Sequence, residues 1–174
     1  MSAPAVRSLI IAEILARLAA ITSPAVGLVI PPSPIGTQIA AFQAAAKAAF
    51  AEGKLVIEVY VGHDDVDEDA ATNIERVRMP VACVVHLPLP TDFDAHPEKL
   101  EQLATAAHAA IYALYATDDL GQWKATGGDG TALARDTVCL GGGGLVVLDN
   151  GDPGTESVFL VKYAHDRGDM GAPR

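Results

Sequence analysis

Apolar residues recur at the three- and four-residue spacing of an amphipathic helix in three segments of the chain, 5–21, 35–51 and 98–116. This spacing places the apolar side chains on one face of each predicted helix. In the last segment, Pro97 and Glu98 are the residue types that helices favour at their start. The apolar stripe of 5–21 is wide, which suggests burial on more than one side, with a neighbouring subunit as one source of cover.

Strands are predicted by a different pattern, in which apolar and polar residues alternate or a short apolar run is bounded by turn residues. The segments with this pattern are 54–61, 79–87, 137–140, 145–148 and 157–163. The sequence DNGDPGTE joins the last two as a hairpin, and the glycines at 141–144 predict a bend or bulge. Together the elements predict an α+β fold, with a mostly antiparallel sheet and helices packed on one face.

The chain is expected to form one domain over residues 1–165, because its 174 residues suit a single core. Four prolines in 22–34 exclude a continuous helix or a central strand there. Polar loops are expected at 63–78 and 117–136, and 166–174 is expected to be a flexible tail.

Composition narrows the classes of function. The net charge of −10 opposes binding along a nucleic acid, although it is compatible with a ring through which DNA passes. No apolar stretch reaches the roughly 20 residues that a membrane span needs. Glu13 and Arg17 interrupt the N-terminal apolar stretch, so this segment is interpreted as an amphipathic helix and not as a signal peptide. Cys83 and Cys139 lie in apolar segments and are expected to be free thiols, which fits a cytosolic origin.

No pattern in the chain predicts catalysis or a cofactor. Asp65, Asp67 and Asp69 have the spacing that opens a calcium loop, but Ala70 and Arg76 occupy the positions that require glycine and a bidentate glutamate. The five histidines include no helical pair at zinc-ligand spacing. The glycine runs do not match a phosphate-binding loop, and no serine has the context of a hydrolase nucleophile. We therefore predict no enzyme activity, no cofactor and no bound metal.

Two polar segments and one tryptophan are predicted to contact partners or to line the lumen of an assembly. The residues are Asp64, Asp65, Asp67, Asp69, Trp123, Asp149, Asn150 and Asp152. Trp123 lies in a polar loop, where it either anchors a partner or folds back on the core. The acidic residues lie in the expected loop and at the tip of the expected hairpin, which are exposed positions suited to contact.

The order of elements resembles that of the tail terminator (tail completion) proteins of long-tailed bacteriophages. The resemblance rests on an N-terminal amphipathic helix, the strands KLVIEVYV and MPVACVVHL, the helix in HPEKLEQLATAAHAAIYALY, and the closing segment SVFLVKYAHDRGDM. It implies a small α+β domain that forms a hexameric ring, which caps the tail tube and joins it to the neck. Against the minimal family pattern, segment 22–53, which holds the proline-rich connection and the second helix, is a candidate insertion. The implied partners are other copies of the chain, the tube protein and a neck or head-completion protein, with DNA only as passing cargo and no membrane. The implied location is the virion, after assembly in the bacterial cytoplasm.

Three alternatives remain open from the sequence. The first is a head–tail joining protein of the neck, which is another structural virion protein. The second is a small metal- or ligand-binding protein that uses the acidic segment 63–69 with His63. The third is a monomeric adaptor that binds one partner through Trp123 and the apolar helix 5–21.

Overall fold

The computed structural model describes residues 5–32, 36–69, 73–89, 96–116, 132–166 and 169–173. These residues form three helices and eight strands in a single sheet. The helices are α1 (Val6–Ala19), α2 (Gly36–Ala51) and α3 (Glu98–Ala116). The strands are β1 (Val26–Ile30), β2 (Leu55–Val61), β3 (Asp65–Asp69), β4 (Ile74–His86), β5 (Asp136–Gly142), β6 (Val146–Val147), β7 (Pro153–Asp166) and β8 (Asp169–Pro173). The predicted α+β class is confirmed.

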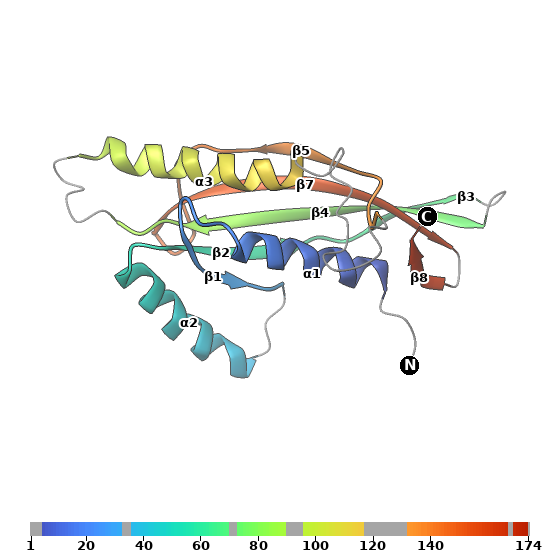
Figure 1. Cartoon of the computed structure of the whole chain (residues 1–174), viewed down its shortest axis with the longest axis horizontal. Helices are drawn as coiled ribbons and strands as arrows, with labels where there is room; N and C mark the ends of the chain where they lie inside the picture. Colours follow the sequence, from blue (N-terminus) through green and yellow to red (C-terminus); the bar gives the residue numbers. More distant parts are fainter. Residues whose placement is uncertain are drawn as a thin grey trace.

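The sheet is organised around two long strands, β4 and β7, which pair antiparallel along their whole shared length (Figure 1). The strand order is β1-β2-β4-β7-β5, with β3 paired to β4 and with β6 and β8 paired to β7. Only β1 and β2 pair in parallel among the described strands. A parallel pair needs a crossover connection, and α2 provides it.

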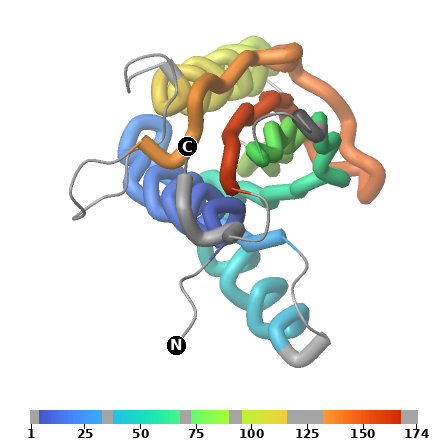
Figure 2. The backbone as a smooth tube through the Cα atoms, turned by 90° about the vertical axis from the view of Figure 1, so that its right-hand side faces the viewer, coloured from blue at the N-terminus to red at the C-terminus, as the bar shows by residue number. Residues whose placement is uncertain are grey.

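The core lies between one face of the sheet and the helices α1 and α3, which lie next to each other (Figure 2). Alternate residues of the central strands point into it, as a period of two requires. They include Ile57 and Val59 of β2, Val81 and Cys83 of β4, and Phe159 of β7, all at most 2% exposed. The apolar stripes of α1 and α3 cover them, so the predicted faces of these two helices are confirmed.

Helix α2 differs from the prediction that the helices pack on one face. It packs on β1 and β2, and it lines a groove with Val56, Glu58 and Tyr60, which alternate with the core residues of β2 and therefore point away from α1 and α3. Gly27 permits the close approach of α2 to β1, since a Cβ at this position would lie 2.7 Å from that of Ala49. Helix α2 projects from the rest of the molecule (Figures 1 and 2).

Two segments predicted to lack regular structure are strands. Residues 65–69, expected as part of a loop, form β3 and pair with the first part of β4, which begins at Ile74. The segment 166–174, expected as a tail, includes β8, which pairs with the end of β7. Both segments are strands because their backbones pair with a long neighbouring strand. The sequence pattern predicts strands only from apolar residues at alternating positions, so it did not predict these two. Segment 22–34 contains the short edge strand β1, which agrees with the exclusion of a central strand.

The predicted bend at the glycine run is confirmed. The register between β5 and β7 shifts between Cys139 and Gly141, as in a bulge. Gly142 and Gly143 have φ of 126° and 105°, a region that L side chains rarely adopt. A Cβ on Gly142 would also collide with the carbonyl oxygen of Glu156. Among the helices of the described residues, none is long and apolar enough to cross a membrane.

Candidate functional site: the open face of the sheet

The face of the sheet opposite α1 and α3 is only partly covered. Helix α2 packs on β1 and β2 at one edge, whereas α3, which contacts β7 and β5, lies on the other face. The apolar residues of β4, β7 and β5 on this face are half-buried or exposed. They are Pro80, Ala82, Val84, Val138, Val158 and Leu160, together with Tyr60 of β2. Tyr60 is 52% exposed and Val138 is 38% exposed. The other five are only partly exposed, and apolar residues that lie together on one face in this way are common at interaction sites.

At the α2 edge, this face contains a groove of about 480 Å³. One wall is apolar and comes from α2, with Ile39, Phe42 and Phe50. The floor is polar and consists of Glu58, Tyr60 and His86 of β2 and β4, a set that we call the groove floor. A volume of this size and an apolar wall with few polar groups are common features of binding sites.

The groove floor is held together by Glu58. The hydroxyl of Tyr60 donates a hydrogen bond to Glu58 Oε2, and this bond raises the pKa of Tyr60 to about 12. His86 Nε2 lies 3.2 Å from Glu58 Oε1, yet the pair does not have hydrogen-bond geometry, and this nitrogen is buried without a hydrogen-bond partner. The groove floor therefore combines a carboxylate with a ring nitrogen whose hydrogen-bonding capacity is unused.

The tip of the β6–β7 hairpin forms the other side of the groove. Asn150 and Asp152 line it, and they also stabilise the turn, since Asn150 Nδ2 donates to Asp152 Oδ2 at 2.8 Å. Beyond the groove floor, a second hollow of about 630 Å³ is lined by Asp149, Glu156 and the exposed Val147. The two hollows share Glu58, Tyr60, His86 and Asn150, so we treat them together as the acidic groove. Three of the residues predicted from sequence as contacts thus lie here.

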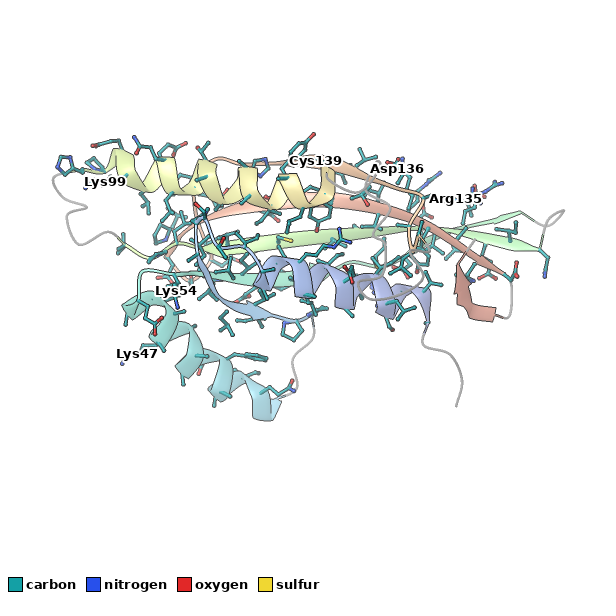
Figure 3. All side chains as sticks on the ribbon, viewed as in Figure 1. Lys47, Lys54, Lys99, Arg135, Asp136 and Cys139 are labelled. Carbon is teal, nitrogen blue, oxygen red and sulfur yellow. The ribbon has the colours of Figure 1, made fainter. Side chains whose placement is uncertain are left out.

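The opposite end of the same face carries four cations among several carboxylates. A cavity of about 230 Å³ is lined by Arg76, Arg78, Arg135 and Lys162, with Asp67 and Asp136 as the only carboxylates among its lining residues. We call these four cations the basic end. Asp136 Oδ2 accepts from Lys162 Nζ at 3.0 Å, and Arg78 Nη1 lies 3.3 Å from Asp65 Oδ2. Figure 3 shows Arg135 and Asp136 toward the β3–β4 side of the molecule, well separated along its length from Lys47 on α2.

The acidic residues of segment 63–69 do not gather into one site. Asp65 and Asp67 lie on β3 opposite Arg78 and Arg76, and the pairing places them at the basic end. A strand spaces such carboxylates along its length, whereas a calcium loop must wrap them around one point. No group of three or more His, Cys, Asp or Glu residues that could hold a metal is found within the described ranges. Asp69 ends β3, and Trp123 lies outside the described residues.

Asp64 connects α1 to the sheet. Its Oδ2 accepts a hydrogen bond from Arg7 Nε at 3.1 Å and another from the hydroxyl of Tyr163 at 3.2 Å. Burial, followed by the charge of Asp64, raises the pKa of Tyr163 above its usual value. Both contacts are made by one carboxylate oxygen of this predicted partner contact, whose Oδ1 is buried without a hydrogen-bond partner, and they indicate a role in holding the fold.

Replacing Asp64 by alanine is expected to lower the free energy of unfolding by about 1–2 kcal/mol, because it removes one acceptor from two partly buried donors. Chemical denaturation monitored by circular dichroism measures this. The matched control is Asp65→Ala, one position along, whose side chain is 73% exposed and whose contact with Arg78 is expected to contribute less than about 0.5 kcal/mol. Equal effects of the two substitutions would contradict the structural role of Asp64.

A serine and a histidine also meet in the core-facing part of the sheet. His108 Nδ1 of α3 lies 2.7 Å from Ser157 Oγ of β7. Ser157 is 0% exposed, so its hydroxyl does not face solvent where a substrate would arrive. The pair links α3 to the central strand and satisfies a hydroxyl that would otherwise be buried alone.

The structure thus defines an α+β domain whose most distinctive surface is an open sheet face with an apolar centre, an acidic groove at one end and a cavity lined by four cations at the other. A comparison with protein-family models found no match, and a comparison with curated proteins found none either.

Proposed function

We propose that the protein is a structural subunit that assembles into a ring, as phage tail terminators do, to cap a tail tube and join it to the neck. The observation that carries the proposal is the open sheet face. A head-to-tail ring needs two different surfaces on each subunit, complementary to each other. The acidic groove and the cation-lined cavity at the other end are two different surfaces, and the apolar centre between them supplies area to bury.

Two further features support this function. The α+β fold, with its long antiparallel strands under α1 and α3, is the architecture that the resemblance to tail terminators implies. The net charge of −10 suits a lumen through which DNA passes without being held. A neck protein that joins head to tail would use the same surfaces, and it differs only in which assembled particle it binds.

The mass of the native protein in solution tests the proposal. We expect a species of about six copies of the 18.0 kDa chain, and negative-stain images with a central hole. Leu160→Asp, which places a charge in the apolar centre, is expected to remove this species without unfolding the monomer. Tyr112→Ser on the outer side of α3, where the side chain is 49% exposed, is the matched control and should leave the assembly intact. A protein that stays monomeric at every concentration would count against the ring.

A further inference from the structure

Helix α2 is anchored to the sheet near its C-terminal end. Among its side chains that the structure describes, only Ala49 is buried, and it packs so closely on β1 that a Cβ on Gly27 would lie 2.7 Å from its own Cβ. The backbone nitrogen of Lys54 donates a hydrogen bond to the carbonyl of Ala49 at 2.9 Å, just before β2 begins. Toward the N-terminal end, Ile39 is 47% exposed. Figures 1 and 2 show this end of α2 standing away from the sheet.

The groove of about 480 Å³ lies between α2 and β2, and apolar side chains line both of its sides. Ile39 and Phe42 line it from α2, and Val56 and Tyr60 line it from β2. Phe42 is half-buried and Tyr60 is 52% exposed. The groove therefore keeps apart apolar surfaces whose contact with each other would remove both from water, which is favourable.

We infer that α2 is a lid that closes over the groove by turning about its anchored end, so that Ile39 and Phe42 come to rest on Tyr60. This movement needs a backbone segment that changes conformation at the anchored end, and hinges are commonly a few residues at the end of an element. Gly53 provides such a segment, because its φ is 68° and a Cβ at this position would meet nothing within 4 Å. The lid is a property of one subunit, so the inference goes beyond the proposed ring and does not depend on it.

The groove floor provides the force that opposes closure. The side chain of Glu58 is 30% exposed, and it accepts the hydrogen bond of the Tyr60 hydroxyl. Closure covers this carboxylate with apolar side chains and removes part of its contact with water, which is unfavourable for a charged group. The position of α2 is thus a balance between apolar contact, which closes the lid, and hydration of Glu58, which opens it.

Distances between two spin labels within one molecule test the inference. One label is attached at Ala41→Cys on α2, and the other at Val147→Cys, a 79% exposed position on β6 that lines the same hollow as the groove floor. Cys139→Ala removes the more accessible native thiol, and Cys83 is buried. Pulsed electron paramagnetic resonance is expected to give two populations, one at the separation of this structure and one shorter. Dilution with unlabelled protein keeps labels of different subunits apart.

The control pair places the first label at Ala51→Cys, at the anchored end of the same helix. It should give one population, because a turn about this end hardly moves it. Two populations in the control pair would assign the spread of distances to β6 or to the labels and overturn the inference. One population for the Ala41 pair, in the unchanged protein and in Glu58→Gln, would overturn it as well.

Two substitutions shift the balance in opposite directions. Phe42→Ser removes apolar contact and is expected to lower the ratio of closed to open molecules roughly tenfold. Glu58→Gln removes the charge, keeps an oxygen that accepts from Tyr60, and is expected to raise this ratio roughly tenfold. The matched controls are Ala48→Ser on the exposed side of α2 and Glu156→Gln in the second hollow, and both should leave the ratio as it is. With circular dichroism to verify folding, an unchanged ratio in Phe42→Ser and Glu58→Gln would reject the lid.

Discussion

Replacing Phe159 by alanine is expected to lower the free energy of unfolding by about 4 kcal/mol, the largest effect of any single change considered. Phe159 is 0% exposed at the middle of β7, between β4 and β5. Its ring stacks on that of Tyr115, with centroids 3.4 Å apart and planes within 4°. Truncation removes this stacking contact between α3 and the sheet and leaves a cavity, a combination that costs about 3–5 kcal/mol for buried phenylalanine.

Urea denaturation measures this loss as a lower midpoint with an unchanged slope. Phe159→Leu keeps most of the volume and is expected to cost roughly 1 kcal/mol. Tyr112→Ala, on the exposed side of the same helix, is expected to change stability by less than about 0.5 kcal/mol. If Phe159→Ala cost no more than Tyr112→Ala, the packing of α3 on β7 would not be the centre of the core.

The helices could be predicted closely from the sequence because their burial follows a simple period. Helices α1 and α3 begin and end within two residues of the predicted segments, and the core faces of β2 and β4 have the predicted alternation. The first part of β4 was not predicted, since its outward positions are Arg76 and Arg78 and its sequence resembles a loop. Strand β3 is almost wholly acidic and has no apolar signal at all.

The open face was harder to predict than the elements that form it. The sequence shows that β2 has two faces, but it does not show which face the helices cover. The basic end combines β4 with β7 and Arg135, which are distant along the chain and become neighbours only through strand pairing. One signal was available: the spacing of Arg76 and Arg78 continues the outward alternation of β4. The hairpin tip with Asp149, Asn150 and Asp152 was predicted as a contact surface, and it borders the acidic groove.

Stability is expected to fall as the pH rises above about 9, and Cys83 is expected to account for much of the loss. Cys83 is 0% exposed on β4, and burial raises the pKa of its thiol from 9.0 to about 11. Burial raises the pKa of Tyr115, whose hydroxyl lies 3.7 Å from Cys83 Sγ, in the same direction. Above pH 9 the unfolded chain therefore releases protons that the folded chain retains, which favours unfolding.

For a shift of about two units, the loss from Cys83 by pH 11 is roughly 2–3 kcal/mol, since each unit corresponds to 1.36 kcal/mol. This contribution is fully present below the unfolded pKa and disappears as the pH rises through the folded pKa. Denaturation series from about pH 8 to about pH 11 should show a shallower decline for Cys83→Ala than for the unchanged protein, even though the substitution lowers stability at pH 8 by removing buried volume. Cys139→Ala on β5 keeps the Cys83 thiol and should retain the steep decline. Equal slopes for the unchanged protein and Cys83→Ala would mean that the thiol ionises as readily in the folded protein as in the unfolded one, and that the contact with Tyr115 does not exclude water.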